Sequence, residues 1–144
     1  MKKLTKIVVV IMIAVFAFCL CACTQDGKVT LVVVGYETKV YTVDTTGKNL
    51  STLKDLMDYL VENDEFSYEE TGGFLNSVNG KSPSETEFWG IYTDLVINEI
   101  EYYNDDWGTA AYDGKTYGSA MKGIVELPLS SGATYLLKLT VMEW

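Results

Sequence analysis

Three short patterns in the chain have residue types that could take part in catalysis. Ser119 and Lys122 have the Ser-x-x-Lys spacing in which a lysine activates a serine, but the companion Ser-Asp-Asn and Lys-Thr-Gly elements do not occur. Residues 80–82, Gly-Lys-Ser, lack the upstream glycine spacing of a phosphate-binding loop. Glu85 and Glu87 alternate next to a predicted turn, which is typical of exposed carboxylates rather than of an acid–base pair. We therefore expect that the protein is not an enzyme.

The composition removes much of the remaining catalytic and metal chemistry. The chain of 144 residues contains no histidine, and its three cysteines all lie within the first 23 residues. Histidine is the commonest general base and, with cysteine, the usual ligand of zinc, copper and iron, so we expect no site for these metals. Only hard cations, which bind through oxygen ligands, remain possible. If the protein holds a metal at all, Asp105, Asp106 and Asp113 are the candidates for binding calcium, although their spacing is not that of an EF-hand loop.

One residue near the start of the chain is a candidate for covalent lipid attachment. Lysines at positions 2, 3 and 6 precede an apolar run over residues 7–18, and Leu20 and Ala22 precede Cys23. A basic start, a short apolar run and a small residue before the cleavage point are typical of a secretory signal peptide, and the run is short for the roughly 20 residues of a membrane-spanning helix. Residues 20–23 resemble the lipobox of bacterial lipoproteins. We expect acylation of Cys23 and anchoring in membrane lipid on the extracytoplasmic face of the cell membrane.

This interpretation divides the chain into a signal peptide over residues 1–22, a lipidated tether over residues 23–28 and one domain over residues 29–144. The tether can extend over roughly 17 Å, which would keep the domain close to the membrane. After cleavage, eight of the eleven lysines and all twenty acidic residues remain, which gives a net charge of −12. A surface with so few cations is not expected to bind nucleic acid.

The hydrophobic pattern predicts a small α+β domain. Residues 29–36 and 38–43 have the composition of two paired strands, with a turn at 35–37. A helix of about twelve residues is predicted next, with Ser51 at its N-cap, because apolar residues recur at the spacing of one helical face. These residues are Leu53, Leu56, Met57, Leu60 and Val61. Strands at 74–78 and 88–92 follow, separated by an Asn-Gly turn, which completes a β-β-α-β-β order.

The second half of the chain is predicted less sharply. Residues 95–118 are expected to form a hairpin or a long ordered loop, with turns at 104–108 and 112–115. A closing hairpin follows, in which residues 123–127 form the first arm, residues 128–132 the turn and residues 134–142 a strand too apolar for an edge. The predicted fold is therefore a small, mostly antiparallel sheet with one packed helix, in β-β-α-β-β order followed by a closing hairpin.

Aromatic residues gather in the middle of the chain. Residues 88–117 contain eight of the protein's aromatic side chains. Trp107 and Tyr112 stand among Asn, Asp and Gly in a predicted loop, where an amphipathic ring could stack on a flat or sugar-like ligand or dock a protein partner. The alternative is that the loop folds back and buries both rings against the sheet.

Three short segments of the predicted elements form a pattern: Thr-Leu-Lys-Asp-Leu at 52–56, Ser-Val-Asn-Gly at 77–80 and Trp-Gly-Ile-Tyr at 89–92. Together they resemble a family of bacterial surface domains related to the C-terminal domain of transcobalamin and intrinsic factor. The resemblance covers about residues 29–142 and implies a non-catalytic domain that binds a ligand through the strand at 88–92 and the turn at 79–80. With the aromatic residues of the second half added, the candidate binding residues are Asn79, Phe88, Trp89, Tyr92, Trp107, Tyr112 and Tyr117.

These observations predict a membrane-anchored binding lipoprotein that captures a small molecule for a membrane transporter. The resemblance implies cobalamin or another corrinoid as the bound ligand, and no cofactor is expected. The alternative is a cell-surface interaction or adhesion module whose partner docks on the loop around Trp107, or a calcium-binding surface protein.

Overall fold

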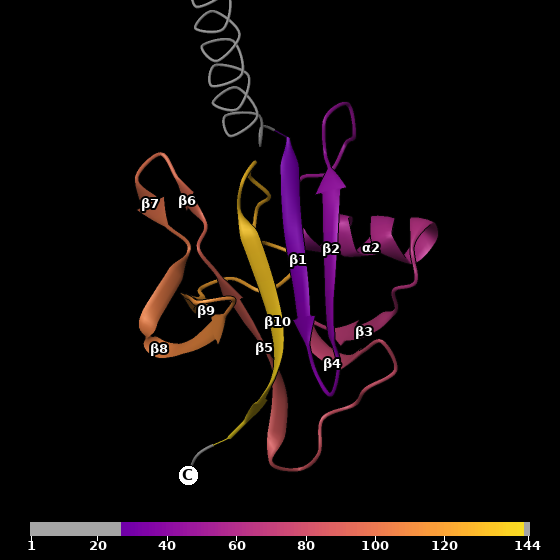
Figure 1. Ribbon diagram of the computed structural model, residues 1–144, viewed down its shortest axis with the longest axis vertical. Helices are drawn as coiled ribbons and strands as arrows, with labels where there is room; N and C mark the ends of the chain where they lie inside the picture. Colours follow the sequence, from indigo (N-terminus) through magenta and orange to yellow (C-terminus); the bar gives the residue numbers. More distant parts are fainter. Residues whose placement is uncertain (1–26, 143–144) are drawn as a thin grey trace, which may run out of the picture.

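The computed structural model describes residues 27–142, and a six-stranded sheet organises them (Figure 1). The predicted signal peptide, Cys23 and most of the tether lie outside the described residues. Strand order in the sheet is β2-β1-β10-β5-β9-β8, and β3–β4 and β6–β7 form separate two-stranded hairpins. The elements are β1 (Lys28–Val34), β2 (Thr38–Asp44), α2 (Leu53–Asn63), β3 (Tyr68–Thr71), β4 (Phe74–Val78), β5 (Glu87–Thr93), β6 (Val96–Ile97), β7 (Ile100–Glu101), β8 (Tyr103–Tyr112), β9 (Lys115–Ala120) and β10 (Thr134–Val141).

The predicted fold class is confirmed. Within residues 27–142 the chain has the β-β-α-β-β order, one helix, and a sheet whose neighbouring strands are antiparallel except for β1 and β10. Strand β10 lies between β1 and β5, as its long apolar run predicted. Because β10 runs parallel to β1 and antiparallel to β5, the sheet is mixed.

Helix α2 covers one face of the sheet. Its buried residues pack against the odd-numbered apolar residues of β1 and against Tyr135 and Leu137 of β10. The helix begins one residue later than predicted, because Thr52 is the N-cap. The Thr52 hydroxyl accepts a hydrogen bond from the Asp55 backbone at 3.3 Å, and the Asp55 carboxylate accepts one from the Thr52 backbone at 3.1 Å. This reciprocal pair satisfies backbone donors that have no partner within the helix.

The hairpin of β8 and β9 covers part of the other face. Ala110 of β8 and Tyr117 of β9 pack with Tyr92 of β5. They also pack with Val32 of β1 and Leu136 of β10. All five side chains are buried. The sheet therefore has two cores, a large one under α2 and a small one under this hairpin.

Residues 95–118 form two hairpins in succession. The predicted turn at 112–115 is confirmed, because Asp113 and Gly114 join β8 to β9 with φ of 48° and 76°. The predicted turn at 104–108 is wrong, since these residues belong to β8. They nevertheless leave the ladder: Asn104 pairs with Ser119 and Thr109 with Gly118, so residues 105–108 bulge outward.

The first arm of the predicted closing hairpin is a turn rather than a strand. Residues 123–127 place Ile124 and Leu127 in the large core. Their carbonyl oxygens accept hydrogen bonds from the backbone N–H groups of Lys54 and Leu53, both at 2.9 Å. These donors lie in the first turn of α2, where the helix itself offers no acceptor, so the segment serves as a second cap.

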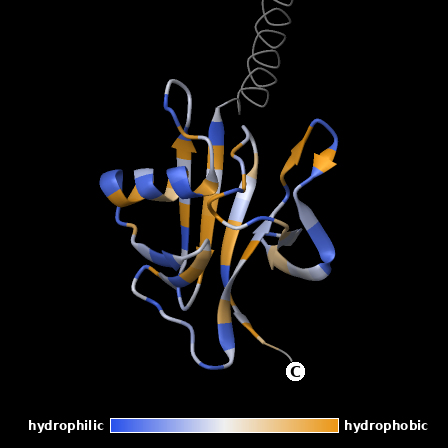
Figure 2. Cartoon of the chain, turned by 180° about the vertical axis from the view of Figure 1, so that it is seen from behind, coloured by the Kyte–Doolittle hydropathy of each residue, from blue (hydrophilic) through white to orange (hydrophobic). Residues whose placement is uncertain are grey.

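Hydropathy follows this two-sided arrangement. Figure 2 shows α2 banded in orange and blue, and the β6–β7 hairpin as orange strands joined by a blue turn. Val96 and Ile100 of that hairpin are about half exposed, at 47% and 59%. Within residues 27–142, no helix has the length and apolar character needed to cross a membrane.

Candidate functional site

Strand β5 is paired differently at its two ends. Along its whole length it is antiparallel to β10. On its other side, β9 pairs only with Tyr92 and Thr93, and then turns away toward β8. Residues 87–91 therefore form a sheet edge within the described part of the chain.

The backbone groups of Trp89 and Ile91 point toward this open side. In an antiparallel pair, the N–H and C=O groups of successive residues face opposite neighbours. The Met142 backbone donates to the Thr86 carbonyl at 2.7 Å, which sets residues 86, 88 and 90 as those bonded toward β10. On the side away from β10, the pairing of Tyr92 with Ser119 brings the Ala120 N–H to the Ile91 carbonyl, whereas among the described residues none hydrogen-bonds the Trp89 N–H and C=O or the Ile91 N–H.

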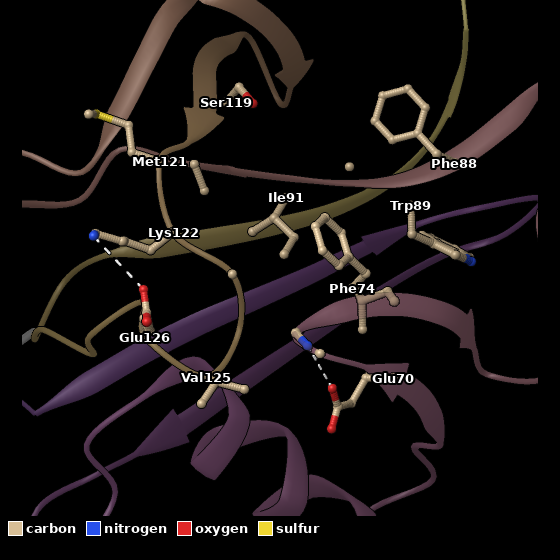
Figure 3. Close-up of a pocket in the computed structure, with 16 residues that line it drawn as sticks. Glu70, Phe74, Phe88, Trp89, Ile91, Ser119, Met121, Lys122, Val125 and Glu126 are labelled. Atoms are coloured by element: carbon tan, nitrogen blue, oxygen red, sulfur yellow. Dashed lines mark hydrogen bonds and ion pairs between the residues drawn. The ribbon is translucent and has the colours of Figure 1, made fainter.

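A groove of about 710 Å³ runs along this edge (Figure 3). The turn between β3 and β4 forms one wall, the edge of β5 the floor, and the end of β9 with the following loop the other wall. Several apolar side chains that line it are exposed, which is unusual for residues of this size. They are Phe74 at 79%, Phe88 at 41%, Met121 at 44% and Val125 at 49%.

Glycines shape the groove at three points. Gly72 and Gly73, with φ of 60° and 90°, make the tight turn that carries Phe74. A Cβ at Gly123 would lie 3.2 Å from the Gly73 carbonyl oxygen, so the two walls approach closely there. A Cβ at Gly90 would lie 2.6 Å from the Tyr92 ring, which covers that position from the other face. Gly90 therefore leaves the edge of β5 without a side chain.

Few charged groups border the groove. The Glu70 carboxylate accepts a hydrogen bond from the Gly73 backbone at 2.9 Å, which fixes the turn. The Lys122 ammonium lies 3.9 Å from the Glu126 carboxylate, and both side chains are more than half exposed. Such a pair contributes little to stability. The groove is thus an apolar slot with an acidic rim and one cation.

No protein-family model matches the chain, and no curated protein matches it. Several solved structures are similar to it. One of them is a crystal structure of a candidate metal-binding protein from Ruminococcus gnavus, with a TM-score of 0.49 and 14% sequence identity over 82% of this chain and 100% of that chain.

Of the predicted binding residues, Phe88 and Trp89 line the groove. Trp89 is only 6% exposed, and its indole N–H donates to the Lys81 carbonyl at 2.9 Å. Tyr92 and Tyr117 are buried in the small core, and the Tyr92 hydroxyl lies 3.0 Å from that of Thr140. Their burial leaves almost no ring surface for a ligand in this structure.

Asn79 lies outside the groove and has a structural contact on each side of its amide. With φ of 50° it occupies the turn after β4. Its carboxamide oxygen accepts from the Ser67 backbone at 3.0 Å, and its nitrogen donates to the Tyr41 hydroxyl at 3.3 Å. Asn79 also lines a smaller pocket of about 200 Å³, where the Lys81 ammonium lies 4.9 Å from the centre of the Tyr36 ring.

Trp107 and Tyr112 are not brought together. Trp107 stands on the β8 bulge and is 62% exposed, whereas Tyr112 packs partly against the small core. Of the two alternatives stated above, exposure therefore holds for Trp107 and partial burial for Tyr112. Neither residue lines the groove.

The candidate calcium ligands are also dispersed. Asp105 and Asp106 border a shallow hollow of about 440 Å³ beside Tyr103, and Asp113 lies in the turn between β8 and β9. Residues 27–142 contain no group of three or more acidic side chains arranged to hold a metal ion. Partial burial, with Glu101 nearby, raises the pKa of Tyr103. That direction reflects partial burial of the phenol and the carboxylates around it.

The residues that form most of the groove were not among the predicted ones. Phe74, Met121 and Val125 contribute its exposed apolar surface. The Gly-Gly pair at 72–73 signals a turn, and an aromatic residue directly after such a turn is the one sequence feature that could have drawn attention to Phe74.

Proposed function

We propose that this protein is a membrane-anchored, extracytoplasmic binding lipoprotein, and that the groove along β5 is its capture site. The predicted acylation of Cys23 supplies the anchor. The observation that carries the capture role is the pair of exposed phenylalanines, Phe74 and Phe88, which line the groove from different elements although neither is needed to fill the core. Exposed apolar side chains gathered in a concave site favour ligand binding.

A binding role rather than a catalytic one agrees with the chemistry of the lining. The charged groups along the groove are Glu70, Lys122 and Glu126, and the nucleophile candidate Ser119 lies at its edge. Lys122 faces Glu126 instead of Ser119 in the contacts of the structure. This contact supports a binding role for the groove over a serine–lysine catalytic one.

The resemblance described above makes a corrinoid the first small molecule to test. In this version the protein would deliver cobalamin or cobinamide to a membrane transporter. The face of the corrin ring, between its peripheral amide groups, would contact Phe74, Phe88 and Met121, and Trp89 in the floor provides an optical signal.

The test has two titrations on the purified full chain. Cobinamide is added while tryptophan fluorescence is recorded, with the Trp107→Phe variant as background so that the exposed Trp107 does not dominate the signal. N-phenyl-1-naphthylamine, a neutral fluorescent apolar probe, is titrated in parallel. We expect the apolar probe to bind, and Phe74→Ala and Phe88→Ala each to weaken it by about tenfold, since each removes roughly the area of one aromatic ring from the contact.

Ile100→Ala is the matched control, because Ile100 is 59% exposed on β7 and does not line the groove. It should leave the affinity unchanged. A cobinamide titration that stays flat at high micromolar concentration would remove the corrinoid version alone. If the apolar probe does not bind, or binds equally to the Phe74→Ala and Phe88→Ala variants, the capture role of the groove is wrong.

A further inference from the structure

The floor of the groove has hydrogen-bonding groups that an apolar small molecule would leave unsatisfied. The N–H and C=O of Trp89 and the N–H of Ile91 face the groove, and no described residue bonds them there, whereas the Ile91 C=O is paired with β9. Their spacing along β5 is that of alternate residues in a strand. The groups that match this spacing best are the backbone donors and acceptors of another extended polypeptide.

The side chains around the edge suit the two faces of an added strand. Along β5, Phe88 points to the face opposite Trp89 and Ile91, because successive strand residues alternate. Phe74 reaches the groove from the β3–β4 turn on the side of the large core, and Met121 reaches it from the end of β9 (Figure 3). A strand placed along β5 would have apolar side chains available on each of its faces.

The end of β9, which forms one wall of the groove, marks the point where an added strand would begin to pair with β5. β9 pairs with β5 at Tyr92 and Thr93 and then departs, so an incoming segment would continue the ladder that β9 begins. Gly90, which has no side chain, sits between the two residues with free backbone groups. Gly73 of one wall and Gly123 of the other approach closely, so the two walls meet at that point of the groove.

Charge indicates what kind of polypeptide fits. Glu70 and Glu126 border the groove, Glu87 begins β5, and Lys122 is the one cation in the lining. The chain without residues 1–22 carries a net charge of −12, so two copies repel each other. These charges favour a basic partner over a second copy of this chain.

We infer that the residue 87–91 edge of β5 captures an extended segment of a basic partner protein, which adds to the sheet as a strand with apolar residues at alternate positions. This inference rests on the proposed function, since it uses the same groove, and it names the class of ligand. The surface is an interaction site for a polypeptide, with the backbone groups of Trp89 and Ile91 giving affinity and Phe74, Phe88 and Met121 giving selectivity.

The test uses a synthetic probe peptide with blocked ends, Lys-Val-Thr-Val-Thr-Val-Lys, and the full chain. Binding is measured by titration calorimetry, and amide protection by nitrogen-15 nuclear magnetic resonance. We expect the peptide to protect the amides of Trp89 and Ile91 against exchange. Two further peptides are methylated on the backbone nitrogens of either the valines or the threonines. Only one set of nitrogens faces β5, so one of these peptides should lose binding by at least about tenfold and the other should keep it.

Substitutions in the protein test whether the peptide binds in the groove. Phe88→Ala should weaken the peptide by about tenfold, whereas Ile100→Ala should not change its affinity. If the neutral apolar probe binds the groove but the peptide does not, strand addition is wrong and the proposed capture role stands. If neither binds, both fail. Equal binding of the two methylated peptides, or self-association of the chain that Phe88→Ala abolishes, would also overturn the inference, the latter by making the occupant a second copy.

Discussion

The two ends of β5 lie in one strand and yet differ in almost every physical respect. At the C-terminal end, Tyr92 and Thr93 have strand partners on both sides and are buried at 5% and 0% exposure. At the N-terminal end, residues 87–91 pair only with β10, and Phe88 is 41% exposed. The first end holds the β8–β9 hairpin onto the sheet, and the second is open to a ligand.

This difference separates stability from binding within a single strand. Loss of a side chain at the closed end should destabilise the domain, because it removes contacts that join two layers. Loss of a side chain at the open end should leave the fold intact and change only what binds. Phe88 and Tyr92 are both aromatic residues of β5. Their substitutions are nevertheless expected to have opposite effects, on binding for Phe88 and on stability for Tyr92.

The largest expected effect is that of Tyr92→Ala. The Tyr92 ring fills the small core and covers Gly90, so its removal leaves a cavity between the sheet and the β8–β9 hairpin. We expect a loss of about 3 to 5 kcal/mol in the free energy of unfolding, measured by urea denaturation. Tyr92→Phe, which keeps the ring, is the control and should lose far less. A loss below about 1 kcal/mol for Tyr92→Ala would mean that the hairpin does not pack as described.

Thr93→Val should have the next largest effect. The Thr93 hydroxyl donates to the Thr134 carbonyl at 2.8 Å and accepts from the Leu95 backbone at 3.2 Å, and the side chain is fully buried. Valine keeps the shape but leaves both partners without a hydrogen bond, at a cost of about 1 to 3 kcal/mol. Denaturation curves of the two proteins give the difference. Equal curves would show that the closed end does not depend on this bridge.

Phe88→Ala tests the open end and should behave in the opposite way. Because Phe88 is partly exposed and lies outside both buried clusters, we expect a stability loss below about 1 kcal/mol together with an approximately tenfold loss of affinity for the neutral apolar probe. The same denaturation and titration experiments measure both quantities. A stability loss as large as that of Tyr92→Ala would erase the distinction between the two ends.

The smallest effect concerns the attachment of the β3–β4 hairpin, which carries Phe74, to α2. Tyr68 of β3 donates a hydrogen bond to Asp58, and burial together with that bond raises the pKa of Tyr68 to about 12. The unfolded value is about 10, so the protonated phenol stabilises the folded state fully below pH 10, and this contribution is lost as the pH rises toward 12.

Tyr68→Phe removes the hydrogen bond to Asp58 and so measures its contribution to stability. The difference in unfolding free energy between the two proteins should be under about 1 kcal/mol at pH 8, because the bond is partly solvated, and should shrink above pH 10. Denaturation at pH 8, 10 and 11.5 measures it. A difference that does not depend on pH would show that the phenol proton is not involved.

The sequence allowed the elements of the fold to be predicted because their signals are local. The apolar spacing of α2, the Asp113-Gly114 turn and the apolar run of β10 each depend on neighbouring residues. The parallel pairing of β1 with β10 joins segments about a hundred positions apart, and no local signal specifies it. The one-residue error at the helix start arose because Ser51 and Thr52 are both good caps, and only the Asp55 contact distinguishes them.

The candidate site was predictable only in part for the same reason. The strand at 88–92 was singled out, yet a sequence cannot show that β9 leaves β5 after Tyr92, which is what opens the groove. Nor can it show that the β8–β9 hairpin folds over the second face and buries Tyr117, while the bulge leaves Trp107 exposed. In the sequence, Phe74 has no feature that distinguishes it from other strand residues. Only the folded Gly72–Gly73 turn places its side chain in the groove.

The most direct test of the central claim, that residues 87–91 form an open sheet edge, is amide hydrogen exchange of the full chain without ligand. We expect an alternating pattern along β5, in which the amides of Phe88, Gly90 and Tyr92 exchange slowly and those of Trp89 and Ile91 exchange quickly. Addition of the probe peptide should then slow Trp89 and Ile91. If the amides of Trp89 and Ile91 are already as protected as that of Gly90, the edge is covered and residues 87–91 are not open to a ligand.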